Sequence, residues 1–169
     1  MITGGHIAAS YLLAEGARRM GFPLTSNEVI QIIIAGNVMD IDFLVGLMTG
    51  KTGEAHHQNF THTPFGAILL WAGLLLLFKP TPVLSGLFLI SIFFHLILDD
   101  IGYWAYRFKI IKVKINPQIN WLYPLTRFHK NKLMIGNKEV LNFYLFKAWP
   151  VALLEILLIL IATIVFIQA

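Results

Sequence analysis

Two shortages define this chain at the outset, because it has no cysteine and few charged residues. Without cysteine, its 169 residues can form neither disulfide bonds nor thiolate metal sites. Only 13% of the residues are charged, against ~25% in a typical soluble domain, while 57% are hydrophobic and the mean hydropathy is +0.70. This composition predicts lipid as the main solvent, and the length allows one compact unit. We therefore expect a single membrane domain over 1–169.

Acidic residues are also missing from the stretch 107–138, which holds eight of the thirteen Lys and Arg residues. A nucleic-acid-binding patch is one interpretation of such a run. The stretch lies between two strongly apolar segments, however, so the positive-inside rule favours a cytoplasmic loop. We expect no nucleic-acid partner. We expect membrane lipid as the partner, with Arg107, Arg127 and Lys130 contacting anionic headgroups of a substrate.

The apolar runs predict an all-α, polytopic membrane bundle of about five helical segments. We place these segments at 4–20, 27–45, 64–78, 83–104 and 147–167, with a basic cytoplasmic loop over 105–146. A bilayer core of ~30 Å requires about 20 residues of helix, and the last two segments reach that length. The first segment is short and mildly amphipathic, so it could span thinly or lie in the interface. Its sequence lacks the features of a secretory signal peptide.

The basic loop also sets the expected topology. If it lies in the cytoplasm, the fourth segment ends there and the third begins there. The polar connection 49–63 is then cytoplasmic as well, so the second segment ends and the first begins on the same side. Arg18, Arg19 and Lys79 fall on the other side, which departs modestly from the positive-inside rule. We expect a multi-pass protein of the cytoplasmic (inner) membrane.

Histidine and aspartate side chains occur at the segment ends that this topology brings to one face. The candidate metal ligands are His6, Asp40, Asp42, His57, His62, His95 and Asp99. His95 and Asp99 are four residues apart, so they project from one face of a helix. Such a pair could simply be a hydrogen-bonded staple, but acids in apolar segments are costly and tend to be paired or functional. Together the candidates favour a metal site that faces the cytoplasm.

Two acidic positions depend on local structure that the sequence leaves open. Asp40 and Asp42 would diverge on a regular helix, and they could converge only if the segment unwinds near Gly36 and Asn37. Glu155 is the only charged residue in the last segment. A neighbour could satisfy its carboxylate, or it could be a headgroup or proton site.

Four short blocks carry the candidate ligands in a recognisable order. They are Gly5-His6, Asp40-Ile41-Asp42, His57 with Phe60-Thr61-His62, and His95 with Asp99. In this order they resemble the YdjM-like family of membrane-bound metal-dependent hydrolases, and Trp121-Leu122-Tyr123-Pro124 is similar to a later element of that family. The proline before the family's aspartates and the histidine after them are Met39 and Phe43 here. The resemblance implies a metal-hydrolase architecture, distantly similar to zinc-dependent phospholipase C and P1 nuclease.

The leading functional hypothesis is a metal-dependent hydrolase that acts on a phosphoester or lipid-linked substrate at the cytoplasmic membrane surface. Imidazole and carboxylate ligands suit zinc, manganese or iron, and we expect about one to three divalent ions, zinc first. Asp40 or Asp42 would bridge ions or hold the attacking water, and Thr61 would orient the imidazoles. Two alternatives stay open: a non-catalytic membrane scaffold with a structural metal site, and, ranked lower, an ion or proton transporter.

Overall fold

The computed structural model describes residues 3–41, 59–126 and 146–168, and these residues form helices and their connections, with no strand among them. The α-helices are α1 (Thr3–Arg19), α2 (Ser26–Asn37), α4 (Pro64–Phe78), α5 (Pro82–Asp99), α6 (Ile101–Arg107) and α8 (Trp149–Gln168). Two short 3-10 helices, η1 (Val38–Asp40) and η3 (Phe60–His62), follow α2 and precede α4. For the described residues, the all-α prediction is confirmed.

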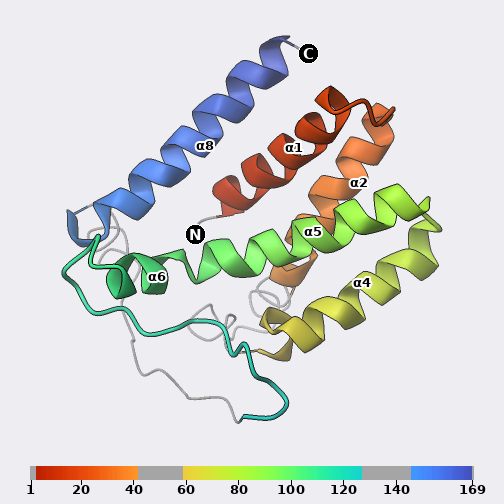
Figure 1. Ribbon diagram of the computed structural model, residues 1–169. Helices are drawn as coiled ribbons and strands as arrows, with labels where there is room; N and C mark the ends of the chain where they lie inside the picture. The colour runs from red at the N-terminus through yellow and green to blue at the C-terminus, as the bar shows by residue number, and fades with distance from the viewer. Residues whose placement is uncertain (1–2, 42–58, 127–145, 169) are drawn as a thin grey trace.

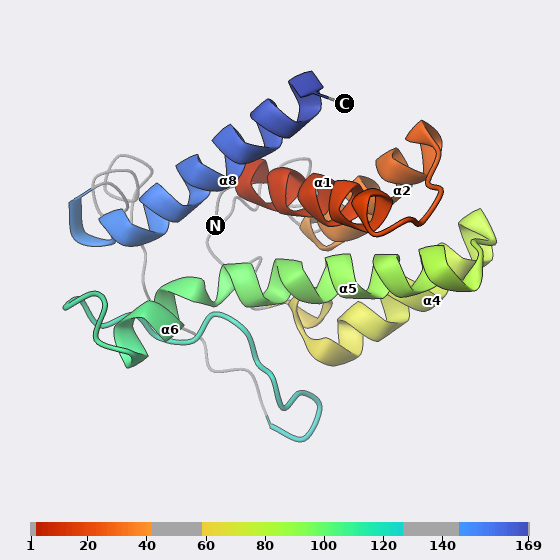
Figure 2. The ribbon, with the colours of Figure 1, turned by 45° about the horizontal axis from the view of Figure 1, so that its top comes forward.

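The helices pack around α5, which contacts α1, α2 and α4 (Figure 1). Helix α8 packs along α1 on the outside of this group, as a second view also shows (Figure 2). The chain direction places the starts of α1 and α4 at the same end of the bundle as the ends of α2 and α5. That end of the bundle therefore collects the segment termini that carry the candidate ligands.

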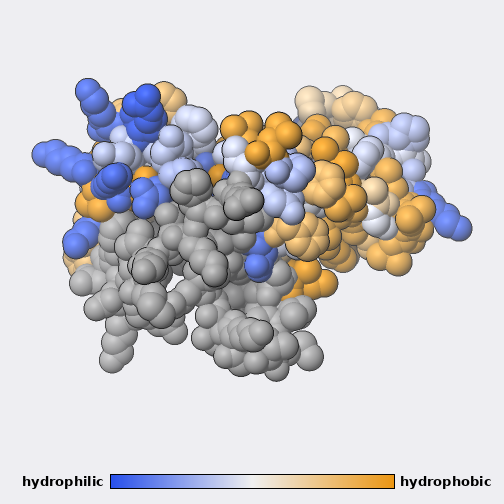
Figure 3. Space-filling view, turned by 90° about the horizontal axis from the view of Figure 1, so that it is seen from below, coloured by the Kyte–Doolittle hydropathy of each residue, from blue (hydrophilic) through white to orange (hydrophobic). Residues whose placement is uncertain are grey.

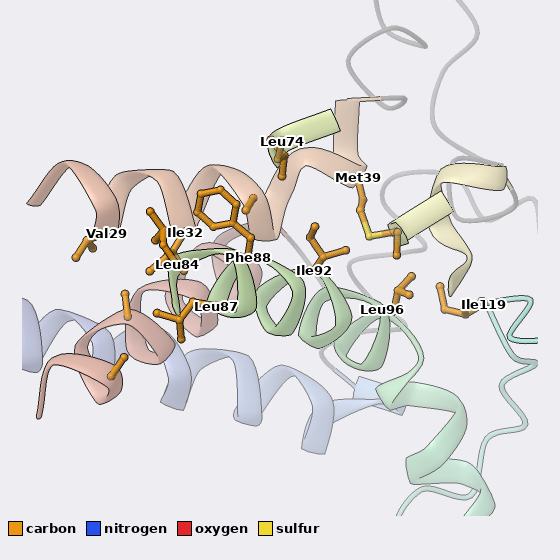
Figure 4. Packing of buried hydrophobic residues seen from close by; sticks show 14 residues of the cluster. Val29, Ile32, Met39, Leu74, Leu84, Leu87, Phe88, Ile92, Leu96 and Ile119 are labelled. Atoms are coloured by element: carbon orange, nitrogen blue, oxygen red, sulfur yellow. The ribbon is translucent and has the colours of Figure 1, made fainter. Parts of the chain in front are cut away.

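The core lies mainly between α2 and α5 (Figure 4). On α5, the fully buried residues Phe88, Ile92 and Leu96 recur every four positions and form one apolar stripe. Ala14 and Ala17 on α1 are also fully buried, and their small side chains let α1 lie close to the other helices. This packing fixes α5 at the centre, so the residues on its last turns are held by neighbours on several sides.

Two predicted segments end differently from the sequence-based expectation. The segment 83–104 is broken, because α5 ends at Asp99 and a separate helix α6 begins at Ile101. Between them, Asp100 is fully buried and its carboxylate accepts hydrogen bonds from the Gln118 backbone N–H at 2.7 Å and from Trp121 Nε1 at 2.8 Å. These bonds tie the break between the two helices to the loop that follows α6.

The segment predicted at 27–45 also changes character, because α2 ends at Asn37 and continues as η1. The side-chain amide of Asn37 donates to the Ile33 carbonyl at 2.8 Å, a local bond of the kind that competes with regular helix structure. The residues after Ile41 lie outside the described part of the chain. The other three predictions are accurate to about two residues, and 64–78 coincides with α4.

Two of the described helices, α5 and α8, are long and apolar enough to cross a membrane, and α4 is a shorter apolar helix. Large apolar side chains are exposed on α4 and α8, among them Leu76, Leu77, Phe166 and Ile167. In Figure 3, apolar residues dominate the right half of the described surface and hydrophilic ones gather toward the left. These surfaces suit contact with lipid. The full set of five membrane segments remains a prediction.

Candidate metal centre

Five of the predicted ligands meet at the end of α5. His6 comes from the start of α1, Asp40 from η1, His62 from η3, and His95 and Asp99 from the last turns of α5. All are buried except Asp40, whose side chain is 18% exposed. Elements that are far apart in the sequence thus place three imidazoles and two carboxylates in one small space.

The closest approaches within this cluster involve the Asp99 carboxylate. Its Oδ1 lies 2.9 Å from His6 Nε2, and its Oδ2 lies 3.2 Å from His95 Nε2 and 3.7 Å from His62 Nε2. Asp40 Oδ1 lies 3.5 Å from His95 Nε2 and 3.6 Å from His62 Nε2. Each carboxylate therefore faces more than one ring nitrogen.

The five side chains form two overlapping groups of three that could hold a metal ion. One group is His6, His95 and Asp99, and the other is Asp40, His62 and His95. Within each group, the potential ligand atoms lie within 4.8 Å of one another. The described residues therefore contain a His/Asp group with the donor atoms and spacing of a metal site.

The hydrogen bonds of His95 show that the cluster fits a cation. Its Nδ1 lies 2.8 Å from the Gly36 carbonyl oxygen, which can only accept, so Nδ1 carries a proton. In the neutral ring the lone pair is then on Nε2, the atom that faces Asp40 and Asp99. Nε2 is buried and makes no well-formed hydrogen bond. A lone pair that faces two carboxylates requires a cation or proton between them, and metal-ligating histidines commonly donate their other N–H to a carbonyl.

Helix α5 meets α1 and α2 at a close crossing behind the cluster, where Gly36 lies against two serines. Ser91 Oγ donates to Ser10 Oγ at 3.0 Å, and Ser10 Oγ donates to the His6 carbonyl at 2.9 Å. A Cβ on Gly36 would lie 2.1 Å from Ser10 Oγ and 2.3 Å from Ser91 Oγ. A larger residue would therefore displace these hydrogen-bonded hydroxyls, and this crossing fixes the helices that carry His6 and His95.

His62 is positioned by the turn that starts α4. Thr63 Oγ1 donates to the Phe60 carbonyl at 2.6 Å and accepts from the Gly66 N–H at 3.0 Å, which caps the helix. Thr61 Oγ1 lies 3.3 Å from His62 Nδ1. This is the contact through which we expected Thr61 to orient the imidazole, and that role remains a prediction.

The surroundings of the Asp40 carboxylate favour its ionised form. Partial burial raises its pKa, but the interactions with His62 and His95 lower it more, so that the pKa lies below its usual value. In contrast, burial raises the pKa of Asp100, which faces Trp121 and the Gln118 backbone rather than the cluster. Asp40 can therefore supply negative charge to a bound cation.

Glu155 has a partner that the sequence did not reveal. It is buried in α8, and its Oε1 accepts a hydrogen bond from the Gly5 backbone N–H at 3.2 Å. The first N–H groups of a helix lack partners within it, so Glu155 caps α1 from a different helix. The bond fixes the residue that precedes His6.

We expect Glu155→Ala to destabilise the protein by about 1–3 kcal/mol, because the buried Gly5 N–H loses this acceptor. Glu155→Gln keeps a side-chain acceptor and is expected to lose less. The melting temperatures of both variants, measured in detergent beside the wild type, test this difference. Equal melting temperatures for all three proteins would show that the contact contributes nothing to stability.

Several predicted site residues do not enter this description. Asp42, His57, Arg127 and Lys130 lie outside the described residues. Arg107 is exposed at the end of α6, and its contact with headgroups remains a prediction. Sequence reasoning missed the supporting roles of Ser10 and Ser91. The available signal was one small residue on each of three segments, namely Ser10, Gly36 and Ser91. This pattern did not show that the three helices would cross at these residues.

Comparison with known proteins gives one result. The model of a family described as YdjM inner membrane protein matches residues 1–169. Searches of curated proteins and of solved structures give no significant match. The match extends over the whole chain, whereas the resemblance noted from the sequence rested on four blocks and one later element.

Proposed function

The chain belongs to the YdjM inner membrane protein family, and we propose that it is a membrane-embedded, metal-dependent hydrolase of phosphoesters. The observation that carries the proposal is the convergence of three imidazoles and two carboxylates at the end of α5. Zinc is the first candidate, because it accepts both nitrogen and carboxylate ligands. The family and the two apolar helices support a membrane location. An inner-membrane, multi-pass arrangement with the cluster facing the cytoplasm is part of the proposal.

Each side chain has a distinct task in this proposal. A divalent ion, when bound, supplies Lewis-acid polarisation of the phosphoryl oxygen and lowers the pKa of water to about 7. His6, His95 and Asp99 would hold one ion, and the overlapping group of Asp40, His62 and His95 would hold the same ion or a second one. Asp40 is the only partly exposed member of the cluster, so its carboxylate would face the incoming substrate and hold the attacking water.

A phosphoester on a lipid or lipid-linked molecule is the substrate class that best fits the surroundings. Cations neutralise the charge of a phosphoryl group in the transition state, which is a main contribution of metal sites to its hydrolysis. Arg107 is exposed at the end of α6, the helix that follows Asp99 and Asp100 in the chain. Its guanidinium could bind an anionic headgroup close to the membrane surface.

The proposal is tested by hydrolysis of bis-p-nitrophenyl phosphate and of phospholipid in mixed micelles. We expect activity in the metal-loaded protein, its loss after treatment with chelator, and its return when zinc is added. Asp40→Asn should lower kcat by at least about 100-fold, because the charged carboxylate that holds the attacking water is removed. Lys79→Asn should keep full activity, because Lys79 is exposed at the C-terminal end of α4, whereas His62 precedes the N-terminal end of that helix. Metal-loaded protein without hydrolysis of either substrate would overturn this proposal.

One observation favours a second candidate, a membrane scaffold with a structural metal. Four of the five side chains in the cluster are buried, and structural sites are closed by protein ligands, whereas catalytic sites keep an open position. A structural site predicts that metal removal lowers the melting temperature while the loaded protein hydrolyses nothing. X-ray absorption of the zinc-loaded protein separates the two, since an added water ligand indicates a catalytic site.

A further inference from the structure

The turn at the end of α6 presents two large apolar side chains on the outside of the molecule. Phe108 is 69% exposed and Ile110 is 63% exposed, whereas Ile111 beside them is buried. Ile111 and Ala105 pack with Val151 of α8, so the inner side of α6 already has a partner within the chain. Phe108 and Ile110 therefore belong to an outer surface that the described residues leave exposed.

The backbone fixes how this turn presents its side chains, because α6 ends in a Schellman motif. The Ile110 N–H donates to the Ala105 carbonyl at 2.9 Å. The Lys109 N–H donates to the Tyr106 carbonyl at 3.0 Å, and Lys109 has a φ of 60°, a left-handed conformation in which glycine is the usual residue. The turn thus places a cation, in a strained backbone conformation, between two exposed apolar side chains.

Cations surround these apolar side chains, and the sequence from 101 to 138 contains no Asp or Glu. The exposed basic residues are Arg107, Lys109, Lys112 and Lys114. In Figure 3, hydrophilic residues gather on the left, which is the side where α6 lies in Figure 1. Asp99 and Asp100 are buried and face the histidine cluster and the loop after α6, and buried Glu155 faces the Gly5 N–H. The surface therefore carries an excess of positive charge, which complements anionic headgroups.

The depth of α6 in a membrane follows from α5, which is long and apolar enough to cross one. The 18 residues of α5 cover about 27 Å, close to the ~30 Å of a hydrocarbon core. Exposed Lys79 lies just before α5 at one surface, so α6 begins at the other. The Trp104 ring is 5.3 Å from the Tyr103 ring and stacks on Phe108 at 6.0 Å, and Trp and Tyr are enriched at the membrane–water interface. The turn therefore lies at the level of the headgroups.

From the exposed apolar turn, its cations and its depth, we propose that residues 104–114 dock into the headgroup layer of an anionic phospholipid leaflet. Phe108 and Ile110 insert below the phosphates, and the basic side chains around them contact the phosphates. The partner is the lipid of the membrane itself, so the proposal does not depend on the hydrolase activity proposed above. Docking holds α6, and with it the end of α5 that carries His95 and Asp99, at a fixed depth.

A depth measurement tests the insertion of the turn. The chain has no cysteine, so one introduced cysteine carries the fluorophore NBD at a single known position. In vesicles of phosphatidylglycerol and phosphatidylcholine, we expect the probe at Ile110→Cys to be quenched by a lipid with a nitroxide near the top of its acyl chain and to be protected from iodide. The probe at Lys112→Cys should be open to iodide, because that side chain stays at the phosphates. Equal access of iodide to the two positions would overturn the proposal.

Native mass spectrometry of delipidated protein with phosphatidylglycerol and phosphatidylcholine tests the cations. The variant with Lys109→Gly, Lys112→Gln and Lys114→Gln should melt no lower than wild type in detergent, because all three positions are exposed and glycine suits the left-handed turn. Its preference for phosphatidylglycerol should fall about 100-fold, since each surface cation contributes ~1 kcal/mol.

Lys79→Gly is the matched control for this variant. Lys79 is also exposed and left-handed, at the end of α4, but no other Lys or Arg occurs from 52 to 106. Loss of this single cation should lower the preference for phosphatidylglycerol by at most about fivefold. A triple variant that loses no more preference than Lys79→Gly would show that the turn of α6 is not a docking surface for anionic lipid.

Discussion

Replacing Asp99 by asparagine is expected to weaken zinc binding by more than about 100-fold. Asp99 faces all three histidines of the cluster, with oxygens 2.9 Å from His6 Nε2, 3.2 Å from His95 Nε2 and 3.7 Å from His62 Nε2. Loss of a group that merely orients a ligand already costs about 10–100-fold in affinity, and Asp99 is positioned to be a ligand itself. Asparagine keeps the size of the side chain but removes the negative charge.

The neighbouring acid provides a matched control for this variant. Asp100 is also buried, but its carboxylate accepts hydrogen bonds from Trp121 and the Gln118 backbone. Asp100→Asn should therefore lower stability while it leaves the zinc affinity of the folded protein within a few-fold of the wild type. Equilibrium dialysis against a zinc buffer measures both affinities. Equal weakening in the two variants would argue against a specific role of Asp99 in the site.

Gly36→Ala is expected to destabilise the protein by about 1–3 kcal/mol, because the crossing of α1, α2 and α5 has no room for a methyl group. The added Cβ would lie 2.1 Å from Ser10 Oγ and 2.3 Å from Ser91 Oγ, so either the two hydroxyls must turn away from their hydrogen bonds or the helices must separate. The Gly36 carbonyl accepts the bond from His95 Nδ1, and displacement of α2 should therefore weaken zinc binding as well. Both effects come from one substitution that touches no candidate ligand.

Gly86→Ala is the control for the glycine effect itself. Gly86 lies in α5, and a Cβ there would meet nothing within 4 Å. Replacement of a helix-interior glycine by alanine is ordinarily stabilising by up to about 1 kcal/mol. The two variants should thus change the melting temperature in opposite directions. A Gly36→Ala protein as stable as the wild type would mean that the three helices do not cross as described.

The parts of the fold that the sequence predicted well are those that local chemistry decides. Pro64 begins α4 and Lys79 ends it in a left-handed conformation before Pro80, and the segment predicted at 64–78 has the same bounds. The i,i+4 spacing of His95 and Asp99 likewise placed them on one face of α5. Gly36 and Asn37 indicated an irregular end of α2, where the structure has the 3-10 helix that carries Asp40.

The parts that the sequence missed depend on contacts between distant residues. The break at Asp100 is accompanied by bonds to residues 18 and 21 positions away, and Glu155 meets Gly5 across 150 positions. No local pattern reports such partners, since helical periodicity describes only neighbours within about two turns. The same reason explains why seven candidate ligands could be named while their mutual distances could not.

The metal content of wild-type protein, purified from membranes without chelator and without added metal, tests the central claim most directly. The cluster of His6, Asp40, His62, His95 and Asp99 predicts about one to three divalent ions per chain, with zinc first, by elemental analysis. Metal should be absent from Asp99→Asn protein prepared in the same way. Folded wild-type protein that carries no divalent metal, and that takes up none in dialysis against zinc, would contradict the assignment.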